Sequence, residues 1–270
     1  MTNNILTVDV ITYNHKPCIA KCLDSLLEQE TDFGFIIRVF DDYSTDGTTE
    51  ICREYAEKHP NKIFFYPTEK NLGVIENPIR AYSNIETPYY MLIEGDDYSY
   101  GQGRFQRQVK ILEEHPECSF CAAKWGQFNT HTGSRIVRTK CIILDKKYPQ
   151  CFLGDITQEI ELLRQGPMYF VDECFCAYNL TGTGIWSEKT TFKKIGYLLK
   201  NLEEYDKYTK HAYHSLLIDV FCCHARVDLS LDTSGTNVLR CFYVKIIHVV
   251  CDVFRFIELK QRGELKCSLF

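Results

Sequence analysis

The 270-residue chain lacks several features that would place it in a specialised class of protein. It has no surplus of basic residues, since 31 Lys and Arg face 36 Asp and Glu, and this balance argues against nucleic acid as a partner. Glycine (15) and proline (8) are too scarce for a fibrous or low-complexity chain. No window holds about 20 uninterrupted apolar residues, so we expect no membrane-spanning helix. The 45% apolar content predicts an ordinary globular protein.

Cysteine is present, but not in the patterns of a disulfide scaffold or a zinc ribbon. The first eight residues lack the basic segment, apolar segment and cleavage site of a secretory signal, so we expect a cytoplasmic chain whose 14 cysteines stay mostly reduced. Cys118 and Cys121 form a CxxC inside a predicted strand, where they would point to opposite faces. Cys174 and Cys176 lack zinc-ribbon spacing. The cysteines are therefore predicted to be small buried apolar residues.

The first 125 residues alternate between predicted strands and helices. Apolar runs at 5–12, 35–40, 62–66, 89–93 and 118–123 are typical of buried strands, and helical patterns occupy 17–27, 46–59, 74–85 and 102–115. Such β-α repetition predicts an α/β fold, a doubly wound and mostly parallel sheet with helices on both faces.

The second half is less regular. Residues 135–144 alternate like an edge strand, and helices are predicted over 155–164, 189–202 and 211–224. No linker separates the halves, so we expect one domain over residues 1–237, with halves 1–125 and 126–237. Residues 238–270 are expected to form a C-terminal helical appendage.

That appendage has an amphipathic pattern over residues 238–262. On a helical projection most of its charged residues and one histidine share a single arc, and bulky apolar residues fill most of the rest. The arc contains Arg240, Lys245, His248, Asp252, Arg255, Glu258 and Arg262. Two interpretations stay open: a helix packed on its own domain or on a partner, including a second copy, and a helix lying in a membrane interface.

Polar clusters directly follow three of the predicted strands. They are residues 12–15, the pair Asp41 and Asp42, and residues 94–97. Ligands of an open parallel sheet bind beyond the carboxyl ends of its strands, so these clusters should converge there. Crowded carboxylates repel one another, and a divalent cation relieves that repulsion. Because Mg²⁺ favours carboxylates together with phosphate oxygens, the sequence predicts a metal-bound diphosphate.

Three phosphate-binding or catalytic motifs are absent. No GxGxxG follows the first strand, no GxxxxGK[ST] occurs, and there is no GxSxG. A phosphate would therefore be held through metal rather than through backbone N–H groups. A nucleotidyltransferase could share an acidic crevice, but residues 11–14 lack the glycine-rich basic loop that such enzymes normally carry.

These motifs, taken in order, resemble the family 2 glycosyltransferases. The matching segments are VDVITYN (8–14), LDSLLEQ (23–29), VFDDYSTDGT (39–48), NLGV (71–74) and EGDDY (94–98), the last similar to a DxD variant of many bacterial members. The resemblance covers about residues 5–125. It implies a GT-A fold, a nucleoside-diphosphate sugar donor that is UDP-linked, a Mn²⁺ or Mg²⁺ ion and, usually, inversion at the anomeric carbon.

The resemblance also implies roles for residues that bind the nucleotide. Thr12 and Tyr13 would line the base pocket, and Asp41 or Asp42 would accept a hydrogen bond from the base. Arg80, which follows the NLGV segment, is a candidate phosphate or base contact, or else an exposed helix arginine.

The EGDDY segment would supply the metal site. Asp96 is expected to bind the cation, and Glu94 or Asp97 to contact ribose or complete the metal shell. Glu94 stands where the DxD pattern usually has Asp, which makes its role the least defined of the three.

The general base of this family is usually a carboxylate downstream of a segment like residues 181–186. Asp206 is the favoured candidate and Glu204 the next, with Asp219 and the pair Asp172 and Glu173 as alternatives. The implied activity is extension of a surface polysaccharide, lipooligosaccharide or lipid-linked glycan at the inner face of the cytoplasmic membrane. The alternative is a non-catalytic sugar-nucleotide or glycan-binding module of the same fold.

Overall fold

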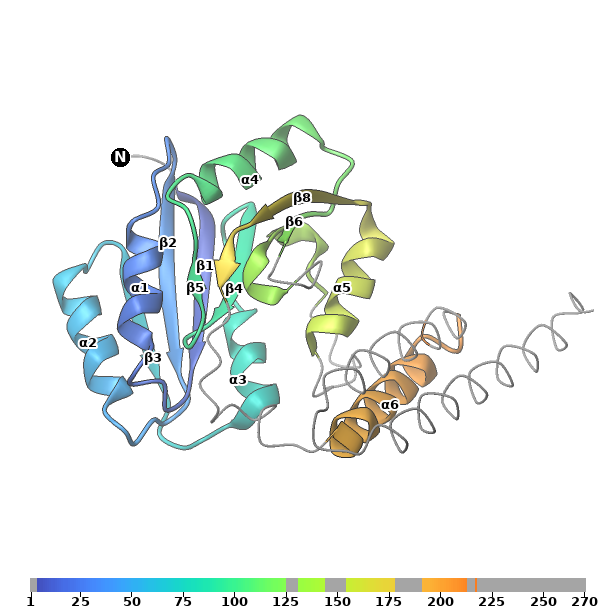
Figure 1. Ribbon diagram of the computed structural model, residues 1–270, viewed down its shortest axis with the longest axis horizontal. Coiled ribbons are helices and arrows are strands. Elements are labelled where there is room, and N and C mark those ends of the chain that lie inside the picture. Colours follow the sequence, from blue (N-terminus) through green and yellow to red (C-terminus); the bar gives the residue numbers. More distant parts are fainter. Residues whose placement is uncertain (1–3, 125–130, 144–153, 178–190, 213–216, 218–270) are drawn as a thin grey trace, which may run out of the picture. The chain divides into compact units, whose positions relative to one another are not determined.

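The computed structural model describes residues 4–124, 131–143, 154–177, 191–212 and 217 (Figure 1). The chain divides into two compact units, a first unit of residues 1–145 and 154–181 and a second unit of residues 146–153 and 182–270. The domain boundary predicted at residue 237 lies outside the described residues. Within the described ranges, no helix has the length and apolar content needed to cross a membrane.

The first unit alternates strands and helices as predicted. Its strands are β1 (Asn4–Thr12), β2 (Gly34–Asp41), β3 (Ile63–Pro67), β4 (Tyr89–Glu94), β5 (Tyr98–Ser99), β6 (Phe120–Lys124), β7 (Arg135–Arg138), β8 (Met168–Cys174) and β9 (Cys176–Ala177). Its α-helices are α1 (Ile19–Leu27), α2 (Thr48–Lys58), α3 (Gly73–Ala81), α4 (Arg104–Glu114) and α5 (Gly154–Gln165). Two short 3₁₀ turns, η1 (Thr132–Ser134) and η2 (Thr139–Cys141), flank β7.

Seven of the described strands form one mixed sheet in the order β3-β2-β1-β4-β7-β6-β8 (Figure 1). β1 pairs in parallel with both β2 and β4, and the pairs β2–β3 and β6–β8 are parallel as well. β7 is antiparallel to both of its neighbours. The predicted α/β fold with a mostly parallel sheet is therefore confirmed.

The prediction of an edge strand at residues 135–144 is wrong. β7 is short and lies inside the sheet, between β4 and β6. Ile136 and Val137 are buried in different apolar clusters, which is the pattern of a strand covered on both faces. Arg135 is also buried, because its guanidinium contacts Glu159 Oε2 at 3.2 Å and donates to Thr132 Oγ1 at 3.0 Å. The sequence alone does not distinguish a charged residue that is buried with its hydrogen-bond partners from one that is exposed to solvent.

Helices cover both faces of the sheet. The larger apolar cluster packs α1, α2 and α4 against one face, where β4 contributes Met91 and Ile93. The smaller cluster packs α3 and α5 against the other face, where β4 contributes Tyr90 and Leu92. Because successive strand residues point to opposite faces, this alternation makes β4 a fully buried central strand.

A buried ion pair joins β1 to β2 on the face that α3 covers. Asp9 and Arg38 are register partners, and Arg38 Nε and Nη2 each donate to an Asp9 carboxylate oxygen at 2.7 Å. Burial lowers the pKa of Arg38, but the hydrogen bond and charge of Asp9 outweigh it, so that pKa is raised overall. The guanidinium also donates to the carbonyls of Ala81, Ser83 and Asn84, which ends α3 earlier than predicted.

In the second unit the structure describes one complete helix, α6 (Thr191–Tyr208). It confirms the helix predicted over residues 189–202 and continues beyond it. Leu198, Leu202 and Tyr205 recur at helical spacing and are buried. The helix predicted over residues 211–224 lies mostly outside the described residues.

Candidate active site

The polar segments that follow β1, β2 and β4 meet at one edge of the sheet. Thr12 is the register partner of Asp41, and Ile11 is the partner of Glu94. The pairing continues past the strands, since the N–H of Asp42 donates to Thr12 O at 2.9 Å and the N–H of Gly95 donates to Ile11 O at 2.8 Å. The sequence therefore predicted this convergence correctly.

The loops after β1 and β2 are joined by hydrogen bonds between side chains and backbone. The N–H of Asn14 donates to Ser44 Oγ at 2.9 Å, and the N–H of Thr45 donates to Asn14 Oδ1 at the same distance. Asn14 and Tyr43 both have left-handed backbone angles, with φ of 54° and 65°. Such conformations persist only where the surroundings fix them, and they are concentrated at functional sites.

Gly95 allows the acidic loop to lie against the end of β1. A Cβ atom at this position would come within 2.8 Å of Thr12 Oγ1 and 2.9 Å of Ile19 Cδ1. A real Cβ atom essentially never lies that close to another heavy atom, so any larger residue would push the loop away. The glycine therefore determines how closely Asp96, the next residue, approaches the edge of the sheet where β1, β2 and β4 end.

Asp96 carries an unsatisfied oxygen. Its Oδ1 is buried and has no hydrogen-bond partner among the residues that the structure describes. Its Oδ2 lies 3.9 Å from Nε2 of His15, a residue to which the sequence analysis gave no role. Burial lowers the pKa of His15, although the charges of Asp96, Asp46 and Asp41 oppose that shift. A neutral imidazole leaves the Asp96 charge uncompensated, and an orphaned carboxylate oxygen of this kind suits a divalent cation.

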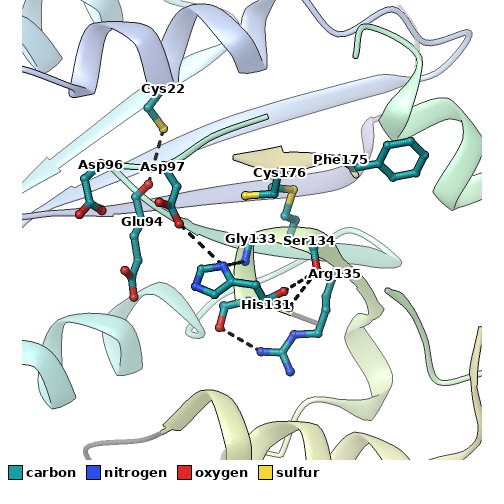
Figure 2. A network of polar contacts seen from close by, with 12 residues as sticks. Cys22, Glu94, Asp96, Asp97, His131, Gly133, Ser134, Arg135, Phe175 and Cys176 are labelled. Atoms are coloured by element: carbon teal, nitrogen blue, oxygen red, sulfur yellow. Dashed lines mark hydrogen bonds and ion pairs between the residues drawn. The ribbon is translucent and has the colours of Figure 1, made fainter. Parts of the chain in front are cut away.

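Asp97 and Asp96 contact different histidines. The Asp97 side chain is buried and points toward His131, with 3.7 Å between Asp97 Oδ2 and His131 Nδ1, as Figure 2 shows. Glu94 is half-buried, and its backbone carbonyl accepts the N–H of Asp97 at 3.0 Å, which closes the turn between them. The three acids of the EGDD segment thus point in different directions.

Asp41 and Asp42 are both nearly inaccessible and hold the local structure together. Asp41 accepts hydrogen bonds from Ser44 Oγ and Thr49 Oγ1, each at 2.5 Å. Asp42 accepts the N–H of Leu72 at 2.6 Å and that of Gly73 at 2.8 Å, so its carboxylate caps the first turn of α3. Gly73 has φ of +84°, which explains why a glycine stands there. The DD and NLG motifs are therefore parts of one cap.

Tyr13 and Arg80 offer surfaces beside these loops. The Tyr13 side chain is 44% exposed, whereas Thr12 is buried. Arg80 donates to Asn77 Oδ1 and Tyr66 O, each at 3.0 Å, and its guanidinium lies 5.3 Å from the centre of the Phe40 ring. Burial lowers the pKa of Arg80, while the charges of Asp42 and Asp41 act against the shift. The positive charge of Arg80 therefore lies near the acidic loops. Part of its guanidinium is already hydrogen-bonded within the first unit.

The two favoured general-base candidates lie on α6 of the second unit. Glu204 is half-buried, and Asp206 is only 7% exposed. Asp206 Oδ2 lies 2.8 Å from Nδ1 of His211, whose own N–H donates to the carbonyl oxygen of Asp206 at 2.8 Å. This pairing agrees with a structural role for His211. Lys210 and His211 both have left-handed backbone angles just after the end of α6.

The other base candidates are surface residues or lie outside the described residues. Asp172 contacts Lys124 at 3.2 Å and Glu173 contacts Arg107 at 2.5 Å, and the side chains of all four residues are exposed. Asp219 and residues 181–186 are not among the described residues.

This topology, with an acidic loop at the carboxyl edge of the central strands, is that of the GT-A class of nucleotide-sugar transferase folds. The chain belongs to glycosyl transferase family 2, because the sequence pattern of that family matches residues 7–179. TuaG of Bacillus subtilis, a putative teichuronic acid biosynthesis glycosyltransferase, is 25% identical in an alignment 233 residues long that covers 75% of this chain and 91% of that protein.

Two solved structures share the fold at low sequence identity. The mannosyltransferase PcManGT from Pyrobaculum calidifontis, in complex with GDP-Man and Mn²⁺, has a TM-score of 0.62 at 16% identity over 92% of this chain and 80% of that one. Residues 1–349 of S. aureus TarS, in complex with UDP-GlcNAc, give a TM-score of 0.56 at 17% identity, covering 96% of this chain and 92% of that one. Mycobacterial relatives that are 34% identical over 116 residues align over only 34% of their own length.

Proposed function

We propose that this chain transfers a sugar from a nucleoside-diphosphate sugar to a hydroxyl of a growing glycan. The observation that carries the proposal is the buried, unsatisfied Oδ1 of Asp96 at the edge where β1, β2 and β4 end. A nucleoside diphosphate brings phosphate oxygens that a carboxylate-bound cation coordinates, which fits an acidic edge without a glycine cradle.

Asp96 would hold the cation, Mn²⁺ or Mg²⁺, with Glu94 contacting ribose or completing the shell. When bound, the cation offsets the negative charge that develops on the departing nucleoside diphosphate. His15 stays neutral beside Asp96 and so does not compete with the cation for the carboxylate charge. Asp97 is the alternative ribose contact, although its side chain is directed at His131.

The nucleoside would lie along the end of β1. Tyr13 exposes enough of its ring to stack on a base, and Thr12 would line the same pocket. Asp41 or Asp42 would accept a hydrogen bond from the base, since a carboxylate has more lone pairs than their present hydrogen bonds use. Arg80 would contact phosphate or base. We propose UDP as the nucleotide; TarS binds UDP-GlcNAc, whereas PcManGT binds GDP-Man, so both donor types belong in the test.

The acceptor would be a hydroxyl of a surface polysaccharide, lipooligosaccharide or lipid-linked oligosaccharide, a class supported by the biosynthetic role in the name of TuaG. Inversion requires the hydroxyl to attack from the face opposite the leaving group and to lose its proton to a base. Asp206 is our first choice for that base, since its hydrogen bond to His211 fixes its orientation, and Glu204 is the second.

We further propose that the protein works at the inner face of the cytoplasmic membrane, held there by residues 238–262. A chain without residues 238–270 should then lose its cosedimentation with anionic vesicles while remaining soluble. If the truncated chain instead aggregates and the intact chain does not bind vesicles, the segment packs on its own domain or on a second copy.

The deciding assay measures nucleoside-diphosphate release from a panel of UDP-, GDP- and dTDP-linked sugars with Mn²⁺ or Mg²⁺ and glycan acceptors. Asp96→Ala should abolish release by more than about a hundredfold, the scale of one lost electrostatic contact to the leaving group. Asp32→Ala, an exposed carboxylate change in the same unit, should not alter release and serves as the matched control.

Two outcomes would redirect the proposal. Undiminished release by Asp96→Ala would remove the cation role of that residue. Tight binding of one nucleotide sugar by calorimetry, without release from any donor and acceptor pair, would identify a non-catalytic binding module. Full transfer by Asp206→Asn, finally, would move the base to Glu204 or to another carboxylate.

A further inference from the structure

A second cluster of metal-ligand side chains lies behind the acidic loop. Asp97, His131 and Cys176 each present one ligand atom, and these atoms all lie within 4.8 Å of one another. Asp97 and Cys176 are fully buried, and His131 is largely so. Figure 2 shows the three side chains next to one another. Asp96 is not one of the three ligands, and its Oδ2 lies 3.9 Å from His15 Nε2 instead.

The backbone around the cluster is fixed by direct hydrogen bonds. β5 pairs with β9, and Ser99, which follows Asp97 by two residues in the chain, lies opposite Cys176. The buried guanidinium of Arg104 donates to Gly133 O at 2.6 Å and to Phe175 O at 3.1 Å, one residue before Cys176. The three ligand-bearing segments are therefore held together before any ion binds, which is what a preorganised metal site needs.

Reciprocal hydrogen bonds fix the orientation of His131. Its Nδ1 accepts the N–H of Gly133 at 3.2 Å, while Ser134 Oγ accepts the N–H of His131 at 3.0 Å. A Cβ on Gly133 would stand 3.0 Å from Cys176 Sγ, so the glycine brings the turn close to the thiol. An ion that took Nδ1 would replace the Gly133 contact with a stronger one.

The donor set selects the kind of metal. One carboxylate oxygen, one imidazole nitrogen and one sulfur suit Zn²⁺, whereas Mg²⁺ and Mn²⁺ prefer oxygen. Ligand atoms of tetrahedral zinc lie about 3.3–3.8 Å apart, given bonds of about 2.0–2.3 Å, so side-chain shifts of about 1 Å would close this cluster on an ion. Cys22 Sγ donates to Glu94 O at 3.8 Å, and that buried thiol is a candidate for a fourth ligand.

A nucleophilic or redox role for Cys176 is less consistent with its surroundings. Burial raises the pKa of this thiol to about 12, which keeps it protonated and unreactive at neutral pH in the absence of a metal. A metal ion offsets such a penalty because it coordinates the thiolate directly.

We propose that Asp97, His131 and Cys176 bind a zinc ion that is distinct from the cation held at Asp96. The ion joins the acidic loop after β4 to η1 and β9, and it fixes the direction in which the EGDD segment presents Asp96. We assign the site a structural role, since Asp97 and Cys176 are buried away from solvent. It thus goes beyond the proposed transfer reaction and does not depend on it.

The test uses Co²⁺ as a spectroscopic substitute for zinc in the full chain after treatment with a chelator. The wild type should take up one equivalent with a thiolate-to-cobalt charge-transfer band, and Cys176→Ser should lose that band. Cys141→Ala, a buried cysteine in the apolar cluster on the other face, should keep it. Asp96→Ala should keep it as well, which separates this site from the donor cation and leaves the result independent of transfer activity.

A second measurement needs no variant and covers the case in which Cys176→Ser fails to fold. Adding Zn²⁺ to the chelator-treated wild type at about 100 times its dissociation constant should raise Tm by about 5–10 °C, because the ion binds only the folded state. Absence of both the cobalt band and the rise in Tm would overturn the proposal. A band that survives Cys176→Ser but disappears in another cysteine variant would also overturn it, since the thiolate would then be elsewhere.

Discussion

Replacing Asp42 tests the inference that this carboxylate caps α3. The side chain is only 4% exposed, and its two oxygens accept the N–H groups of Leu72 and Gly73 at 2.6 and 2.8 Å. Asp42→Ala leaves both N–H groups without their acceptor in a buried place. Asp42→Asn keeps one acceptor oxygen and removes the charge, so the two variants separate hydrogen bonding from charge.

The expected cost follows from these contacts. A hydrogen bond to a charged group contributes about 1.5–3 kcal/mol, and a negative charge at a helix N-terminus adds about 0.3–1 kcal/mol. Part of this loss in stability is offset when the charge is removed, because a buried carboxylate no longer has to be desolvated. We expect α3 to be destabilised by about 1–2 kcal/mol in Asp42→Asn and about 3–4 kcal/mol in Asp42→Ala, judged from those ranges.

Hydrogen exchange followed by mass spectrometry measures this locally, without substrate. At about 1.4 kcal/mol per tenfold, peptides covering residues 72–82 should exchange about 5- to 30-fold faster in Asp42→Asn and about 140- to 700-fold faster in Asp42→Ala. Peptides of α4 serve as the internal reference. Glu76→Gln is the matched control, since it removes an exposed carboxylate from the same first turn and should change exchange less than threefold.

Two results would refute this reasoning. If residues 72–82 exchange at the wild-type rate in Asp42→Ala, the carboxylate does not cap α3. If Glu76→Gln accelerates exchange as much as Asp42→Ala does, charge near the helix end matters and the geometry of the cap does not.

Three further perturbations test other parts of the first unit. Gly95→Ala should lower the free energy of unfolding in urea by about 1–3 kcal/mol through overpacking, whereas Gly103→Ala, with nothing within 4 Å of the new Cβ, should be nearly neutral. Arg38→Met leaves Asp9 buried and unpaired and should lower that free energy by about 3–5 kcal/mol; a smaller loss than in Gly95→Ala would contradict the pairing. For Asp46, burial raises the pKa, but hydrogen bonds from Thr48 and Lys16 outweigh it and depress that pKa below 3.8. Its loop contacts should therefore persist at mildly acid pH and be lost as pH falls through the lower value, with carboxyl carbon NMR shifts as the measurement.

Much of the nucleotide edge could be predicted from sequence because it depends on local order. Continuous apolar runs mark buried parallel strands, and the residues directly after them must meet at one edge. That rule alone brings Thr12, Asp41 and Glu94 together. It also covers His15, whose place in the cluster after the first strand was the available signal for its contact with Asp96.

Features that depend on long-range pairing could not be predicted in the same way. The cluster of Asp97, His131 and Cys176 requires that β9 pair with β5 and that η1 lie beside them, and neither has a sequence pattern. The interior position of β7 escaped prediction for a similar reason, since its arginines find acceptors in segments far along the chain. Spacing rules for cysteine consider neighbours in sequence, so Cys176 was compared with Cys174 instead of with Asp97.

Two adjacent carboxylates in the EGDD segment serve different partners because of the turn that carries them. Gly95 keeps the loop against Thr12, and the bond from the N–H of Asp97 to Glu94 O then reverses the chain. Asp96 is left at the nucleotide edge with an unsatisfied oxygen, while Asp97 points into the interior toward His131. Asp96→Asn should therefore weaken the response to Mn²⁺ without affecting the cobalt band, whereas Asp97→Asn should weaken the uptake of Co²⁺.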